Sequence, residues 1–375
     1  MTSVTTPHST SIVASESAVS SIIVAMAVLA WAGLVGAGVL WGELPYMALS
    51  AVFAAWPLAL AERALAVRSK RSLVDGMQHL TRESDAARGW RFIAYSGLFA
   101  GLLAMVLTAT WAGVFTTVAV QSLMHDQSGW LSSAMLVPAL TTFAVFLGLL
   151  RYVGRANLTH WLLPMLLLAG VSAYSLSHEQ VWPLDSSLAL PGGIGWSAAL
   201  LIGALLGGAG LMVRWPWQQH VTPQPLLQGA SVVFSMAMLI SLMLPGLAAV
   251  LLAAVACLLM LLALARPWLA VLSARGLAMW PALFVVLVVV IGLAEILWYT
   301  AGLIRLQQLS LVLLLWMTVN ALVLAIYAGW IMKMSHARKA LNLPSEAAYN
   351  VWRIAIRWVA PITLLAGVGS LVGLI

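Results

Sequence analysis

Long unbroken runs of apolar residues, separated by short polar segments, dominate this chain of 375 residues. A helix needs about 20 apolar residues to cross a bilayer, so these runs predict transmembrane helices. A membrane barrel would instead show alternating apolar and polar positions in segments of about 10 residues. We expect eleven spans, at 21–41, 46–66, 92–122, 130–150, 158–177, 194–213, 227–244, 246–265, 279–299, 308–332 and 351–374.

The composition agrees with a polytopic membrane protein and excludes most soluble classes. Hydrophobic residues make up 63% of the chain and charged residues 8%, with a mean hydropathy of +1.01. Soluble domains contain about 25% charged residues. A soluble enzyme, a secreted disulfide scaffold and a disordered regulator are therefore excluded, and the single Cys257 allows no disulfide within the chain. Residues 1–20, rich in Ser and Thr, are expected to form a flexible cytoplasmic tail before one transmembrane domain at 21–375.

The charges predict the orientation of the spans. The net charge is +7, but the basic residues are dispersed between apolar runs, which argues against a nucleic-acid partner. With the N-terminus in the cytoplasm, every basic residue except Arg305 falls at an inner span end. This positive-inside pattern predicts an inner-membrane protein with a cytoplasmic N-terminus and an outer C-terminus. The basic loop 63–91 is expected to contact anionic lipid headgroups, with docking of a protein partner as the alternative.

Tryptophan residues gather near the predicted span ends. They include Trp90, Trp130, Trp182, Trp215, Trp217, Trp268, Trp280 and Trp352. Indole rings at span ends are typical of an aromatic belt at the membrane–water interface, and we interpret most of them in this way.

Two spans are rich in glycine at matching positions. The first contains Gly33, Gly36 and Gly38 and is followed by Gly42 and Pro45. The sixth contains four glycines in a short stretch, Gly203, Gly207, Gly208 and Gly210. Glycine disfavours a continuous helix, and paired interruptions in two repeats indicate the central site of a transporter. Close packing of helices through small residues is the alternative.

Several segments, in the same order, resemble the neurotransmitter-sodium symporter family. The family pattern G-N-x-W-R-F-P-Y is similar to Gly38–Tyr46, and an E-R-A-L-G ending of the second span is similar to Glu62–Ala66. Further similar segments are Gly154–Pro164, Gly208–Met212, Gly329–Trp330 and Arg357–Ile362.

The resemblance implies an all-α LeuT-type fold of about eleven helices, with a five-plus-five inverted repeat and broken helices 1 and 6. The first repeat would cover about 21–177, the second about 194–332, and an extra helix 351–374. The substrate site implied by the resemblance comprises Gly36, Gly38, Val39, Trp41, Gly42, Glu43, Thr108, Ala204, Gly207, Gly208 and Gly210.

The sodium ligands of the family are not matched. Val39 stands where the family has a ligating Asn, Ala204 stands for a Ser or Thr, and Leu247–Ala265 contains neither Ser nor Thr. Sodium would be the implied cofactor, but hard cations need several oxygen ligands, so we expect no metal site and no cofactor.

Glu43 replaces the family's gating region and is our candidate coupling residue. A carboxylate within a membrane segment is costly, so it either binds a cationic substrate group or cycles a proton; a hydrated, inert position is the alternative. Glu295 is a similar but more peripheral carboxylate, and Asn320 and Thr318 are expected to make interhelical hydrogen bonds.

We therefore expect a secondary transporter of a small amino-acid-like or amine substrate, proton-coupled or uncoupled. The alternative is a transport-inactive relative that serves as an accessory subunit, with a membrane protein or a second copy as partner. No enzyme motif is present in the sequence.

Overall fold

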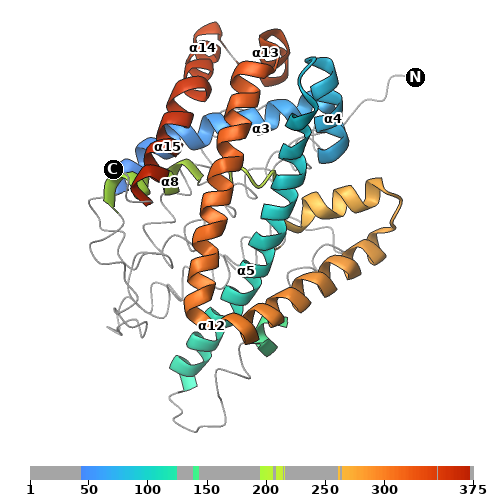
Figure 1. Ribbon diagram of the computed structural model, residues 1–375, viewed down its shortest axis with the longest axis vertical. Helices are drawn as coiled ribbons and strands as arrows, with labels where there is room; N and C mark the ends of the chain where they lie inside the picture. The colour runs from blue at the N-terminus through green and yellow to red at the C-terminus, as the bar shows by residue number, and fades with distance from the viewer. Residues whose placement is uncertain are drawn as a thin grey trace, which may run out of the picture.

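The computed structural model describes residues 44–124, 138–142, 195–205, 208–213, 215, 261, 264–343 and 345–371. Every regular element in these residues is helical (Figure 1). By length and composition, five of the described helices could cross a membrane: Pro45–Ser69, Arg88–Gly113, Met279–Thr300, Gln308–Ile331 and Glu346–Gly369. The prediction of an all-α polytopic membrane protein is confirmed. The predicted spans 21–41, 158–177 and 227–244 lie outside the described residues, as do most of 130–150 and 246–265.

The second predicted span is one helical rod with an irregular turn inside it. It consists of α2 (Leu44–Ser50), the π-helical turn η2 (Ala51–Ala55) and α3 (Trp56–Ser69). Lys70 ends α3 in the left-handed conformation, with φ of 49° and its N–H bonded to Ala66. A short helix, α4 (Leu73–Glu83), and a 3₁₀ turn, η3 (Arg88–Arg91), then lead to the third span.

Two long helices run side by side through the molecule. These are α5 (Phe92–Met124) and the C-terminal part of α12 (Met279–Ile326). Figure 1 shows α12 bent; we call the part before the bend its first arm and the part after the bend, which runs beside α5, its second arm. We predicted two spans here, 279–299 and 308–332, and the candidate spans Met279–Thr300 and Gln308–Ile331 confirm both. They are not separated by a loop, however, because both belong to the one helix α12, which Figure 1 shows sharply bent between its two arms. The segment 300–307 contains no proline and mostly good helix formers, so its polar residues interrupt the apolar run without ending the helix.

The C-terminal part carries two more π-helical turns. After α12 come η5 (Tyr327–Ile331), α13 (Met334–Leu341), α14 (Glu346–Ile354), η6 (Ala355–Val359) and α15 (Ala360–Leu371). The side chain of Ser345 caps α14 by accepting a hydrogen bond from the N–H of Ala348 at 3.1 Å. In Figure 1, α4, α13 and α14 occupy the same end of the molecule.

The structure corrects two interpretations of polar and aromatic residues. Arg63, expected in the basic loop, is buried within α3, and α4 makes much of that loop helical. Trp215 and Trp352, expected in the aromatic belt, are 0% and 3% exposed and donate to the backbone carbonyls of Arg71 and Pro57. A span-end indole can find a carbonyl within the protein when neighbouring chain segments pack over it.

Candidate functional site

The sixth predicted span begins as the helix α8 (Gly195–Leu205) and is interrupted within the core. Residues 208–213 form turns rather than helix, and we call this segment the break. Its backbone has positive φ at Gly208 (70°), Gly210 (88°) and Met212 (54°), and all six residues are buried. The N–H of Leu211 donates to the carbonyl of Gly208 at 3.1 Å, as expected for a turn.

Two of the glycines in this span have different roles. Gly203 lies in α8 against α2, where an added Cβ would meet Ser50 and the Cα of Met47 at 2.8 Å. Gly210 combines a left-handed backbone with close packing, since an added Cβ would meet the Met317 carbonyl and the Cβ of Asn320 at 2.9 Å. Close helix packing therefore explains Gly203, whereas the backbone conformation and packing together explain Gly210.

A chain of polar groups, buried except for the partly buried Trp316, joins the break to α5 and α12. The Asn320 side chain donates to the Gly210 carbonyl at 3.1 Å and accepts from the Ser96 hydroxyl at 2.6 Å. The Trp316 indole in turn donates to the Ser96 oxygen at 2.8 Å. We call Trp316, Ser96, Asn320 and the Gly210 carbonyl the polar relay. The expected interhelical role of Asn320 is confirmed, whereas Thr318 bonds to Leu314 of its own helix, so that expectation was wrong.

The face of α5 toward the break was not anticipated. An added Cβ at Gly97 would meet Met212 Cγ at 2.7 Å and the Gly210 carbonyl oxygen at 3.5 Å, and one at Gly101 would meet the Leu211 carbonyl at 3.9 Å. These glycines allow the backbone of the break to approach α5. A G-x-x-x-G spacing in an apolar helix signals such contact, and 97–101 has this spacing.

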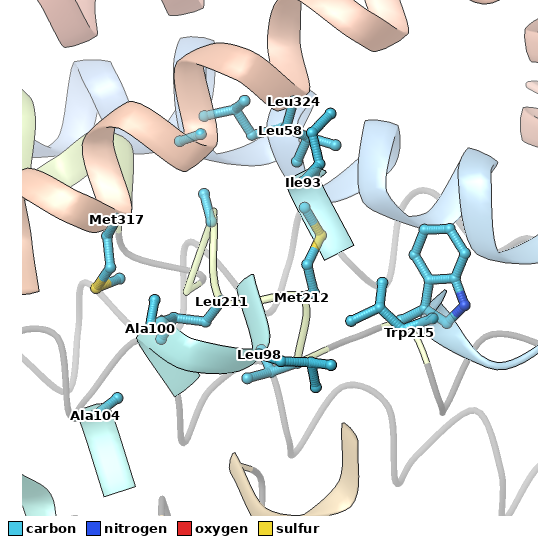
Figure 2. Packing of buried hydrophobic residues seen from close by; sticks show 14 of the residues in the cluster. Leu58, Ile93, Leu98, Ala100, Ala104, Leu211, Met212, Trp215, Met317 and Leu324 are labelled. Atoms are coloured by element: carbon cyan, nitrogen blue, oxygen red, sulfur yellow. The ribbon is translucent and has the colours of Figure 1, made fainter. Parts of the chain in front are cut away.

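Apolar side chains surround the break. In Figure 2, Leu211 and Met212 lie among residues of α3, α5 and α12, including Leu58, Leu98 and Met317. Exchange of water with the break is therefore restricted by the packed core, which strengthens each hydrogen bond of the polar relay.

The described part of the chain contains four of the predicted site residues. Gly208 and Gly210 lie in the break, and Ala204 is buried in the last turns of α8. Thr108 is buried in α5 on the face that carries Gly101, about two helical turns further along. The other predicted residues, Gly36, Gly38, Val39, Trp41, Gly42, Glu43 and Gly207, lie outside the described residues.

Metal ligands do not gather into a centre within the described ranges. Among these residues, no group of three or more His, Cys, Asp or Glu side chains is arranged to hold a metal ion. Glu295 is half-buried in the first arm of α12 and accepts a hydrogen bond from the Thr142 hydroxyl at 3.2 Å.

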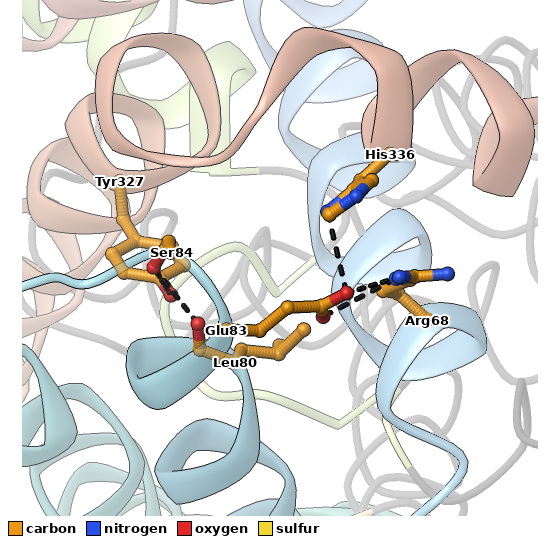
Figure 3. A network of polar contacts seen from close by, with 6 residues as sticks. All are labelled: Arg68, Leu80, Glu83, Ser84, Tyr327 and His336. Carbon is orange, nitrogen blue, oxygen red and sulfur yellow. Dashed lines mark hydrogen bonds and ion pairs between the residues drawn. The ribbon is translucent and has the colours of Figure 1, made fainter.

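An ionic cluster connects the segments at one end of the molecule. Arg68 at the end of α3 forms an ion pair with Glu83 of α4, and His336 Nδ1 of α13 lies 3.4 Å from the same carboxylate (Figure 3). Beside it, the Ser84 and Tyr327 hydroxyls are 3.3 Å apart. The predicted basic loop and the segment after span ten therefore meet at one end, as the charge pattern requires if both lie on the same side.

The Arg68 guanidinium holds the pKa of Glu83 below its usual range by hydrogen bonding and charge, with further contributions from His336 and His79. Partial burial opposes this shift, and the net direction is downward. Glu83 is therefore ionised at neutral pH, and the cluster gains its stability from that charge.

We expect Glu83→Gln to lower the melting temperature at pH 7. Since the folded-state pKa is depressed, the contribution is present above the ordinary glutamate pKa of about 4.3 and is lost as the pH falls through the folded-state pKa. The difference in melting temperature between wild type and variant should therefore persist to about pH 5 and narrow below that. Glu346→Gln is the matched control, because its pair with Arg338 is exposed and contributes little. A difference in melting temperature that does not change with pH would contradict the explanation that the charge of Glu83 stabilises the cluster.

Comparison with known proteins shows the fold. No family model and no curated protein matches the chain. Among solved structures, it is similar to MhsT, crystallised in complex with L-phenylalanine, with a TM-score of 0.67 and 16% sequence identity. The likeness covers 94% of this chain and 98% of that protein. The described helices, the break and this likeness together establish an all-α polytopic membrane protein with a LeuT-type fold.

Proposed function

We propose that the protein is a secondary transporter of a small amino-acid-like or amine substrate. The observation that carries the proposal is the break, an unwound segment buried within the core whose carbonyl is held by Asn320. Non-helical backbone at membrane depth is tolerated where protein or a cavity satisfies it, and in transporters such breaks supply groups that bind substrate. The likeness to a structure that holds L-phenylalanine supports an amino-acid-like substrate.

We propose that the substrate binds between the break and the first span, with Gly36, Gly38, Val39, Trp41, Gly42, Glu43 and Gly207 from outside the described residues, and Thr108, Ala204, Gly208 and Gly210 from within. Transport would follow from rocking of the core spans, which include the break, against the scaffold spans. The protein would lie in the inner membrane with a cytoplasmic N-terminus and an outer C-terminus.

We propose that transport is coupled to protons through Glu43, or is uncoupled, and that it is not coupled to two sodium ions. The family's sodium side chains are replaced at Val39 and Ala204. Ala204 is fully buried at the end of α8, and its methyl group cannot ligate a cation.

The alternative function is that of a transport-inactive accessory subunit in a membrane complex. The loss of ion-ligating side chains favours it. An inert scaffold has no need to keep an interrupted helix with a left-handed glycine at Gly210, however, and this observation favours transport.

Uptake into proteoliposomes tests the proposal. The purified chain would be reconstituted and offered labelled amino acids and amines, L-phenylalanine among them, with proton and sodium gradients imposed separately. We expect saturable uptake that a proton gradient increases and that Glu43→Gln lowers at least about tenfold, since the coupling carboxylate is removed. Glu346→Gln, which alters an exposed pair far from the break, should leave uptake unchanged.

Two results would contradict parts of this proposal. Uptake driven by sodium would overturn the argument on coupling. Absence of uptake for every compound, with stable co-purification of a second membrane protein, would favour the accessory role.

A further inference from the structure

An arginine lies where the two π-helical turns η5 and η6 meet. Arg357 of η6 donates through Nε to the Gly329 carbonyl of η5 at 2.6 Å. Its guanidinium carbon lies 5.1 Å from the centre of the Trp330 ring, and Trp330 packs edge-to-face on Trp358 with ring centres 5.3 Å apart. The two turns pack closely here: a Cβ added to Gly329 would lie only 3.0 Å from Arg357 Cγ. The guanidinium is thus held in one place by a hydrogen bond and an aromatic face.

The contact with η5 sets the depth of Arg357 in the membrane. Gly329 and Trp330 lie in the last turn of the candidate span that ends at Ile331. Arg357 is therefore level with a span end, although it lies midway along the helix Glu346–Gly369. The preceding α14 extends past that level, next to α13 in Figure 1. If this span end lies at the membrane surface, as its apolar run predicts, the cation is at the height of lipid headgroups.

Several hydrogen-bond donors at this corner have no acceptor among the described residues. A guanidinium has five N–H groups, and only the Nε of Arg357 has an acceptor among the described residues. The indole N–H groups of Trp330 and Trp358 likewise have no acceptor within the described part of the chain, and the two residues are 48% and 56% exposed. Arg353, one turn earlier and exposed, adds a second positive charge.

An apolar strip continues from this corner toward the membrane interior. Trp358, Ile362 and Leu365 are all more than half exposed. Their spacing of four and three residues places them on one face of the helix. This arrangement provides positive charge at headgroup height and an apolar surface directly below it.

We propose that Trp330, Arg353, Arg357 and Trp358 form a binding site for the phosphate of an anionic phospholipid. We call this set the Arg357 corner. A guanidinium matches phosphate oxygens with paired N–H donors, and two arginines favour a headgroup with net negative charge over a zwitterionic one. The acyl chains lie along Ile362 and Leu365. This site is separate from the headgroup contact expected at 63–91 and does not depend on the proposed transport function.

Lipid titration of the purified full-length protein tests the site. Phosphatidylglycerol or phosphatidylcholine would be added to delipidated protein in detergent, with bound lipid counted by native mass spectrometry and the melting temperature recorded. We expect phosphatidylglycerol to bind at least about tenfold more tightly than phosphatidylcholine and to raise the melting temperature. Arg357→Gln should weaken phosphatidylglycerol binding by about tenfold, since charge-assisted hydrogen bonds are removed. Lys339→Gln, which removes an exposed charge from α13, should change it less than twofold.

A further titration distinguishes a lipid site from a free-phosphate site. Glycerol phosphate, which lacks acyl chains, should not raise the melting temperature; an equal rise would identify a free-phosphate site and overturn the proposal. Equal affinity for phosphatidylglycerol and phosphatidylcholine would also overturn it. So would an equal loss of phosphatidylglycerol affinity in Arg357→Gln and in Lys339→Gln. If Arg357→Gln does not fold, Trp358→Leu keeps the bond to Gly329 and should weaken phosphatidylglycerol binding by about threefold. No change in that variant would count against the site.

Discussion

Replacing Gly210 by alanine is expected to lower the free energy of unfolding by about 3 kcal/mol, the largest single effect that we expect on the fold. Two effects contribute. The backbone at this position has φ of 88°, which strains any residue with a Cβ. The added methyl group would also press on the Met317 carbonyl and on Ala321 N at 3.1 Å, in a buried part of α12 that cannot easily move.

Gly276→Ala separates these two effects. Gly276 has nearly the same backbone angle, with φ of 90°, but an added Cβ meets nothing within 4 Å. We expect it to lower the free energy of unfolding by about 1 kcal/mol, from the backbone alone. Unfolding in mixed micelles with increasing sodium dodecyl sulfate would measure both. Equal losses in the two variants would show that the packing of the break against α12 contributes nothing.

Asn320→Leu is expected to cost about 2 kcal/mol, because it leaves the buried Gly210 carbonyl and the Ser96 hydroxyl without their shared partner. Leucine fills a similar volume, so the loss reports on the hydrogen bonds more than on a cavity. Thr318→Val is the matched control two residues away. Its hydroxyl bonds within α12, and removing it should cost less than about 1 kcal/mol.

A double-mutant cycle with Ser96→Ala tests whether the polar relay acts as a unit. Interhelical hydrogen bonds in membrane proteins are coupled by about 0.6 kcal/mol on average and up to about 1.7 kcal/mol. We expect a coupling of about 1 kcal/mol between Ser96 and Asn320, since the bond is short and buried. Strict additivity of the two substitutions would show that the relay has no energetic role beyond its separate bonds.

The features that could be predicted from the sequence are local ones. The length of an apolar run is enough to place a span, and the candidate spans Met279–Thr300 and Gln308–Ile331 lie within a residue or two of the predicted 279–299 and 308–332. The cluster of glycines after Ala204 likewise predicted an interrupted helix, because glycine weakens a helix wherever it occurs.

The partners of these residues could not be predicted in the same way. Asn320 lies 110 residues after Gly210 and 224 after Ser96, and no pattern in a single sequence pairs them. The tryptophans show the same limit. Position near a span end does not distinguish Trp280, which is 62% exposed, from Trp215, whose indole is buried against α4. The glycine spacing at 97–101 does indicate close packing on that face of α5, but it does not identify the segment that packs there.

The π-helical turn η2 changes how the second span must be interpreted. A π turn accommodates one residue more than an α turn, so side chains beyond Ala51–Ala55 are rotated by about 100° relative to a continuous α-helix. A helical wheel drawn through the whole rod would then assign the exposed apolar stripe of α2, which includes Tyr46 and Leu49, to the wrong side of α3. The rod thus presents two separate angular registers. The turn allows one end to expose apolar side chains while the other buries nearly all of its residues, Glu62 and Arg63 among them.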